Sequence, residues 1–264
     1  MITKTKNFYG QMVERNIGVI TAEEQERLRN TCVAVAGCGG MGGLSAEQLV
    51  RLGVGHVKIA DFDTFAIHNL SRQCGSTTSN IGHNKAGVLG RHFKSINPGM
   101  NLEVYEDGVT PENVEKFVSS AEIIIDGTDF STFSSTILMY QAARKNNICV
   151  INPNAIGFGV NVFVFGPKTI SIEEHLGLAS GTEGKEALLK LVPYLPSYID
   201  PKVVQKVMSG EMNIPNLAMP QYLGTSIAVS EATMIILGRV KPPAGPSPRI
   251  FILDLQDRKF SITG

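Results

Sequence analysis

The feature that most constrains the fold is an apolar run, 33–36, that leads directly into a glycine-rich turn carrying Gly37, Gly39, Gly40 and Gly43. Glycine lacks the Cβ atom that keeps a backbone away from a phosphate, and a following helix presents free N–H groups at its positive end. A second apolar run, 56–60, ends in Asp61, about 20 residues beyond the glycines, where an acidic residue commonly binds ribose hydroxyls. This order predicts a nucleotide-binding βαβ unit, although glycines at such a turn can also serve tight packing alone.

Strand-like and helix-like segments alternate from residue 31 to residue 151. The strand-like runs are nearly continuously apolar, which favours a parallel sheet covered on both faces. We expect strands at 31–36, 56–60, 101–106, 122–126, 148–151, 159–165, 249–255 and 259–263. We expect helices at 5–15, 21–30, 41–52, 84–96, 111–119, 131–145 and 222–237.

These segments predict an α/β fold that is Rossmann-like and doubly wound. Its sheet is mainly parallel, with added antiparallel strands after residue 152, where the alternation breaks at Asn152-Pro153. Residues 1–171 would hold two N-terminal helices and the nucleotide-binding domain. Residues 172–264 would supply a helical insertion (172–213), a long helix and a terminal hairpin that complete the same domain.

Composition limits the partners and the compartment. The 24 basic and 24 acidic residues cancel, so nothing indicates bulk attraction to nucleic acid or to a membrane surface. No apolar stretch approaches the roughly 20 residues of a membrane span, and the first ten residues do not resemble a signal peptide. The four cysteines have no C-x-x-C spacing, so we expect free thiols, no structural zinc from this chain alone and a cytoplasmic location.

Polar side chains follow several of the expected strands, and parallel strands place their carboxyl ends at one edge of a sheet. Arg72 can hold phosphate oxygens with two hydrogen bonds, and Lys85, near a helix start, adds a point charge. A carboxylate, Asp126 or Asp129, can hold a magnesium ion together with phosphate and water. The full set in this region is Asp61, Asp63, Asn69, Arg72, Gln73, Lys85, Asp126 and Asp129.

The same residues carry a resemblance to a known family. The signature G-x-G-G-x-G-G, the block D-x-D…N-L-x-R-Q, the element G-x-x-K-A and the strand end D-G-T-D resemble the ThiF/MoeB/HesA-like superfamily, the bacterial relatives of ubiquitin-activating enzymes. The match covers residues 8–165 in order. The resemblance implies an adenylyltransferase that uses ATP and Mg²⁺ to convert a carboxylate into an acyl-adenylate with release of pyrophosphate. The carboxylate is commonly the C terminus of a ubiquitin-like carrier protein or of a peptide.

The resemblance also implies roles for single residues. Gly40 and its neighbours would line the phosphates, and Asp61 would hold the ribose. Asn69, Arg72 and Lys85 would contact the phosphates, and Asp129 would bind the metal. Arg15 would reach into the ATP site of a partner subunit, which implies a homodimer; by its residue type alone it is a solvated cation at a helix end.

The sequence departs from the family at its cysteines. Many members have two C-x-x-C pairs and a catalytic cysteine in a loop after the fifth or sixth strand, whereas this chain has no cysteine beyond Cys149. Adenylation without a thioester or persulfide step is therefore the prediction, and Cys74 and His175 are read as incidental side chains. The insertion 172–213 is expected to act as a lid or docking element.

Three other functions stay open. An NAD-dependent oxidoreductase would use the same glycines and Asp61, but would leave N-L-x-R-Q and Lys85 without a chemical task. A non-catalytic nucleotide-fold module is a second alternative. A third is adenylation of a carboxylate carried by tRNA or by a small molecule, although the neutral charge balance does not favour an RNA partner.

Overall fold

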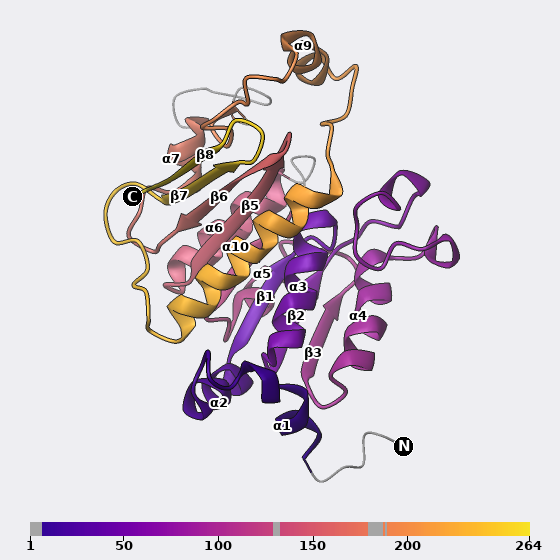
Figure 1. Cartoon of the computed structure of the whole chain (residues 1–264), viewed down its shortest axis with the longest axis vertical. Coiled ribbons are helices and arrows are strands. Elements are labelled where there is room, and N and C mark those ends of the chain that lie inside the picture. The colour runs from indigo at the N-terminus through magenta and orange to yellow at the C-terminus, as the bar shows by residue number, and fades with distance from the viewer. Residues whose placement is uncertain (1–6, 129–132, 179–186, 188) are drawn as a thin grey trace.

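One eight-stranded sheet runs through the molecule, in the order β3-β2-β1-β4-β5-β6-β7-β8 (Figure 1). This computed structural model describes residues 7–128, 133–178, 187 and 189–264. The first five strands in that order pair in parallel, and β6, β7 and β8 are added antiparallel. The strands are β1 (Cys32–Ala36), β2 (His56–Ala60), β3 (Asn101–Tyr105), β4 (Ile123–Asp126), β5 (Cys149–Ile156), β6 (Gly159–Phe165), β7 (Arg249–Asp254) and β8 (Lys259–Thr263).

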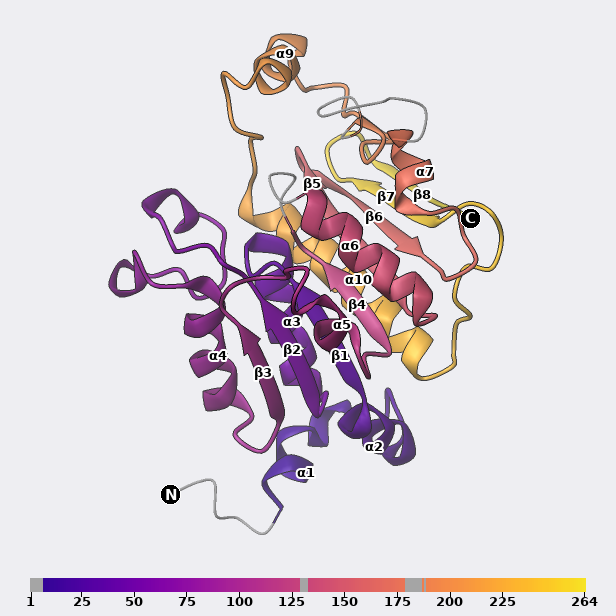
Figure 2. The same cartoon turned by 180° about the vertical axis from the view of Figure 1, so that it is seen from behind.

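Helices cover both faces of the sheet. The face seen in Figure 1 carries α3, α4 and α10, and the opposite face carries α5, α6 and α7 (Figure 2). A hydrophobic core lies on each side. The helices are α1 (Phe8–Met12), α2 (Ala22–Asn30), α3 (Gly40–Leu52), α4 (Lys85–Ile96), α5 (Val114–Val118), α6 (Phe133–Lys145), α7 (Ile172–Leu176), α9 (Pro201–Ser209) and α10 (Ala218–Ile236), with short 3₁₀ turns at Glu14–Asn16, Ile67–Asn69 and Thr78–Asn80. The predicted fold class is confirmed, and none of the described helices is long and apolar enough to cross a membrane.

The fifth strand differs from the prediction. It was expected to end at residue 151, but β5 continues through Asn152 and Pro153 to Ile156. Its neighbour β4 pairs only as far as Ile151, whereas pairing with β6 continues to the end of the strand. Proline lacks an N–H group and is tolerated where one side of a strand has no partner. The proline therefore marks the end of the parallel pairing, not the end of the strand.

The predicted insertion 172–213 combines short helices with irregular backbone among its described residues. Its described part holds α7, α9 and helical residues at 187 and 189, with irregular backbone between residues 190 and 200. Tyr198 anchors this segment by donating a hydrogen bond to Asp254 at 2.8 Å, and Ser197 donates one to Asp257 at 2.9 Å. Side-chain hydrogen bonds to the β7–β8 hairpin thus stabilise the segment in place of helical backbone bonds. The long helix α10 also begins at Ala218, four residues before the predicted start.

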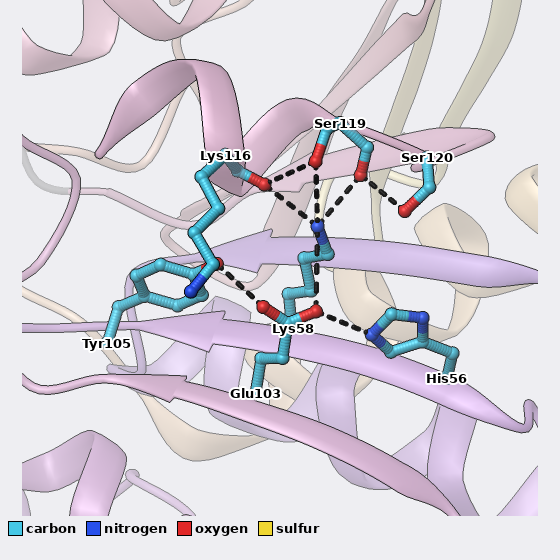
Figure 3. Close-up of polar contacts among 7 residues, drawn as sticks. All are labelled: His56, Lys58, Glu103, Tyr105, Lys116, Ser119 and Ser120. Atoms are coloured by element: carbon cyan, nitrogen blue, oxygen red, sulfur yellow. Dashed lines mark hydrogen bonds and ion pairs between the residues drawn. The ribbon is translucent and has the colours of Figure 1, made fainter. Parts of the chain in front are cut away.

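A buried lysine fastens α5 to the sheet (Figure 3). Lys58, on β2, is among the largest fully buried side chains. Its ammonium group donates hydrogen bonds to the carbonyl oxygens of Lys116 at 2.9 Å and Ser119 at 2.8 Å, at the C-terminal end of α5. Glu103 lies 3.7 Å away and accepts a hydrogen bond from Tyr105. The positive charge therefore meets the negative end of the helix together with a carboxylate.

Replacement of Lys58 by methionine should lower the free energy of unfolding by about 1–3 kcal/mol, because the apolar stem is kept while the carbonyl oxygens of Lys116 and Ser119 lose a charged donor and keep only hydroxyl donors. Urea unfolding measures this loss. Lys116→Ala is the matched control, since its side chain is exposed, and it should stay within about 0.5 kcal/mol of the parent. Equal stability of the methionine variant and the parent would contradict this role for Lys58.

Candidate nucleotide site

A cavity of about 270 Å³ opens at the carboxyl ends of β1, β2 and β4, where the fold predicts a ligand site. Its wall combines the glycine turn with charged and amide side chains from distant segments. Of the residues predicted for the site, it contains Gly37, Gly39, Gly40, Asp61, Asp63, Arg72, Gln73 and Lys85. The topology therefore brings together most of the group that the sequence singled out.

The glycine turn is shaped by close backbone approach. Gly37 has a φ of +81°, in the left-handed region that favours glycine. A Cβ atom on Gly42 would lie 1.8 Å from the Gly37 carbonyl oxygen, and one on Gly127 would lie 2.5 Å from the Gly42 nitrogen. These three glycines thus let the turn and the end of β4 pack against each other. Gly39 and Gly40, in contrast, line the cavity where α3 begins.

Asp61 joins the glycine turn to the segment after β2. One of its carboxylate oxygens accepts a hydrogen bond from the Cys38 amide at 2.6 Å, and the other accepts one from the Asp63 amide at 2.8 Å. Burial raises the pKa of Asp61 above its ordinary value, although these two hydrogen bonds oppose the rise. The carboxylate lines the cavity and can accept further hydrogen bonds there.

The two cations of the cavity are held in different ways. Lys85 is the first residue of α4 and is nearly buried, and its ammonium group lies 2.5 Å from a carboxylate oxygen of Asp63. Burial favours a higher pKa for Asp63, but the hydrogen bond and charge of Lys85 outweigh it and lower that pKa. Arg72 donates a hydrogen bond to the His68 carbonyl oxygen at 2.9 Å. The cavity thus has a fixed ammonium group and a guanidinium group with further donors available.

Two glutamines stand over the glycine turn. The side-chain oxygens of Gln73 and Gln221 are buried and have no hydrogen-bond partner among the described residues, and both residues line the cavity. The Gln73 amide lies 3.5 Å from the position of a Cβ atom on Gly39, and that of Gln221 would collide with a Cβ atom on Gly40. Buried polar atoms normally have partners. Both side chains thus pack against the glycine turn, each with an oxygen that no described residue pairs.

Three predicted site residues lie behind the cavity wall. Asp126 accepts hydrogen bonds from Thr128 at 2.6 Å and Tyr140 at 3.0 Å; burial raises its pKa, and these bonds oppose the rise. Asn69 caps the short turn before Arg72 by accepting a hydrogen bond from the Ala66 amide at 2.8 Å. Gly43 faces Leu89 at the contact between α3 and α4. All three hold the elements that carry the cavity and are not part of its lining.

Two further residues predicted for the site are not among the described residues that line the cavity. Asp129, predicted as catalytic and as the magnesium ligand, lies outside the described residues. Arg15 is exposed in the 3₁₀ turn before α2, which leads into the amino end of β1. The cavity is at the carboxyl end of that strand, and α1 and α2 lie at the opposite end of the sheet in Figure 1. Arg15 therefore does not line the cavity of its own chain.

The sequence does not single out several other residues that line the cavity. They include Phe62, Thr128, Ser135, Asn154, Ile214, Asn216 and Gln221. Gln221 carried a weak signal, because it is the single amide side chain of α10. Ile214 carried none, since its place depends on the path of the chain between α9 and α10.

Cys74 and His175, read as incidental from the sequence, show no sign of acting as a nucleophile or a base in the cavity. Burial and the neighbouring Glu47 carboxylate raise the pKa of Cys74, which leaves its thiol a poor nucleophile. His175 packs edge-on against Phe163 and Phe165, and burial lowers its pKa. Neither residue lines the cavity.

Comparison with protein families identifies the chain. Residues 13–253 match the model of the ThiF family. The chain belongs to the ThiF family. Among curated proteins it is 27% identical over 255 residues to the sulfur carrier protein adenylyltransferase of Thermus thermophilus, covering 97% of this chain and 86% of that protein. It is also 32% identical over 126 residues to the tRNA threonylcarbamoyladenosine dehydratase of Escherichia coli, covering 47% of this chain and 46% of that protein.

Solved structures agree with the fold of this ThiF-family chain. PaaA superimposes with a TM-score of 0.69 at 21% identity, covering 97% of this chain and 78% of that one. Escherichia coli MccB with ATP gives a TM-score of 0.68 at 17% identity, covering 91% and 65%. At these identities the likeness concerns the fold alone. The family match and the adenylyltransferases among the relatives confirm the resemblance found in the sequence and support an enzyme of the adenylyltransferase class.

Proposed function

We propose that the cavity binds ATP and that the protein adenylates the terminal carboxylate of a carrier protein or peptide. The observation that carries this proposal is the joining of a glycine turn with Arg72 and Lys85 in one cavity. A dinucleotide-dependent oxidoreductase needs the turn and Asp61, but has no use for two further cations beside them. A triphosphate carries enough negative charge to need both.

The residues of the cavity suit ATP in several ways. Gly39 and Gly40, at the N-terminus of α3, would receive phosphate oxygens, because free N–H groups and the positive helix end lie there. Asp61 would accept hydrogen bonds from the ribose hydroxyls. Gln73 and Gln221 line the same cavity beside the glycine turn and would border the bound nucleotide.

In the proposed reaction, a carboxylate oxygen of the substrate attacks the α-phosphorus of ATP. The bond to the bridging oxygen breaks, pyrophosphate leaves with that electron pair, and an acyl-adenylate forms. No protein nucleophile is required. The protein positions the carboxylate, and Arg72 and Lys85 stabilise the negative charge that develops on the phosphate oxygens.

Magnesium belongs to the proposal as the ion that accompanies ATP. It would neutralise phosphate charge and would prefer a carboxylate together with phosphate and water oxygens. Asp129 is the ligand that the sequence suggests, and Asp63 and Asp61 are the carboxylates that line the described cavity. All four cysteines are free, which agrees with the proposed cytoplasmic location.

The cavity mouth favours a polypeptide over a small acid as substrate. Phe62 and Ile214 both line the cavity and are 60% and 48% exposed. Leu217, Met219 and Tyr222, in the same segment as Ile214, are exposed as well. A charged interior with an apolar rim suits a partner that brings its own apolar surface and inserts a carboxylate tail. The Thermus relative, named for a sulfur carrier protein, supports the same choice.

The test is acid-dependent exchange of radiolabelled pyrophosphate into ATP. The protein is incubated with ATP, Mg²⁺ and either a small carrier protein with a C-terminal glycine or a peptide ending in the same residues. We expect exchange only with the acid present, and a mass increase of one adenylate on the acid. Thermal stabilisation by NAD and not by ATP would instead favour the oxidoreductase. Exchange driven by a tRNA-borne carboxylate alone would favour the substrate class suggested by the dehydratase relatives.

We also propose that Arg15 completes the site of a second copy in a homodimer. Its exposure and its distance from its own cavity support action in trans, and the neighbouring Ile17 and Val19 offer exposed apolar surface for a dimer contact. Arg15→Ala and Lys85→Ala subunits should each be inactive alone. Refolded as a mixture they should recover about a quarter of parent activity, because half of the dimers then contain one intact site. No recovery would contradict action in trans.

A further inference from the structure

A second group of polar side chains lies outside the cavity, between α3 and α4. Glu47 comes from α3, His92 from α4, and Cys74 from the loop that follows Gln73. One donor atom of each lies within 4.8 Å of the donor atoms of the other two. None of the three lines the cavity, so this cluster is separate from the proposed ATP site.

The carboxylate of Glu47 is the centre of the cluster. Its Oε2 accepts a hydrogen bond from the Cys74 thiol at 2.6 Å and lies 3.3 Å from Nε2 of His92. Its other oxygen is held by Arg51, whose Nε donates a hydrogen bond at 2.7 Å. Arg51 therefore fixes the carboxylate so that Oε2 faces the sulfur and the imidazole. Outer partners of this kind orient the ligands of metal sites.

We propose that Glu47, Cys74 and His92 form a Zn²⁺ site. Thiolate, imidazole and carboxylate are the ligands that zinc takes in proteins, and a water molecule would complete a four-coordinate shell. On binding, the sulfur–hydrogen bond of Cys74 breaks, the sulfur coordinates the ion, and the proton leaves to solvent. The charges of thiolate and carboxylate balance that of the ion. The side chain of His92 is 39% exposed, which gives the ion a path from solvent.

Such a site would restrain the loop that carries Arg72 and Gln73. Cys74 follows Gln73 directly, and the next residue, Gly75, packs against Leu89 of α4. A bound ion would tie this loop to α3, which begins at the glycine turn, and to α4, which begins at Lys85. Zinc would thus hold three parts of the cavity wall together without entering the cavity.

The test titrates the full chain, freed of metal by a chelator, with Zn²⁺ or with Co²⁺ as a coloured probe. We expect one ion per chain and a sulfur-to-cobalt charge-transfer band. Cys74→Ser should remove the band, and both Cys74→Ser and His92→Ala should weaken zinc binding at least tenfold. His83→Ala is the matched control, because this exposed histidine lies outside the cluster and its loss should leave zinc binding unchanged.

Two results would overturn the proposal. One is the lack of stoichiometric binding by the parent chain at micromolar zinc. The other is cobalt binding without that band, or zinc binding that persists in both ligand variants. If Cys74→Ser fails to fold, His92→Ala decides, since its partly exposed ring can be removed without opening the core. Pyrophosphate exchange is not the readout, so the outcome is independent of the proposed reaction.

Discussion

Replacement of Lys85 by alanine should lower the rate of acid-dependent pyrophosphate exchange by about 10²–10³-fold, which corresponds to ~3–4 kcal/mol of lost transition-state stabilisation. The expected loss is large because Lys85 is nearly buried in the cavity wall, where little solvent screens its charge. The fold should survive, since the first residue of α4 accepts alanine readily and the cap by Asn84 is kept.

Two variants make the Lys85 result specific. Arg91→Ala removes an exposed cation from the same helix, away from the cavity, and should leave exchange unchanged. Asp63→Asn keeps the ammonium group but weakens the contact that holds it at 2.5 Å, and should fall between Lys85→Ala and the parent. Near-normal exchange by Lys85→Ala in a folded protein would remove this residue from the proposed mechanism.

Replacement of Gly42 by alanine should destabilise the protein by about 3 kcal/mol or more, although alanine within a helix normally stabilises by about 1 kcal/mol. The added Cβ would lie 1.8 Å from the Gly37 carbonyl oxygen. This neighbour is backbone within the glycine turn and cannot rotate away. A chain of this size should therefore lose about 6–12 °C in melting temperature. The displaced turn should also lose ATP binding.

Gly245→Ala is the matched control for the Gly42 variant. A Cβ atom there meets no atom within 4 Å, and the residue lies in an exposed connector. Differential scanning calorimetry on both variants and the parent measures the effect. A Gly42→Ala protein that melts within about 2 °C of the parent would mean that the contact between α3 and the glycine turn tolerates more separation than the structure indicates.

Local sequence order was enough to place the cations and Asp61 in one cavity. Each follows a parallel strand or begins the next helix, and the carboxyl ends of parallel strands share one edge. Asp61 lies directly after β2, and Lys85 is the first residue of α4. The positions of both side chains therefore follow from the ends of the elements next to them. The alternation of strands and helices is also a local pattern, and it predicted most of the architecture.

Contacts between distant segments were not predictable in this way. Gln221 reaches the glycine turn only because α10 packs across α3, and nothing near Gln221 in the sequence indicates that crossing. Asp126 was expected in the site, but Thr128, Tyr140 and Asn152 all donate hydrogen bonds to it. The sequence thus places the Asp126 carboxylate at the correct edge of the sheet. It does not show that the oxygens of this carboxylate accept hydrogen bonds from residues of the protein itself.

The most direct test of the account is a crystal structure with a non-hydrolysable ATP analogue and Mg²⁺. We expect the triphosphate to lie against Gly39 and Gly40, with Arg72 and Lys85 on its phosphate oxygens and the ribose at Asp61. The α-phosphorus should face the rim formed by Phe62 and Ile214, open to an incoming carboxylate. A nucleotide bound elsewhere, or one whose phosphates contact neither cation, would contradict the proposed adenylation site.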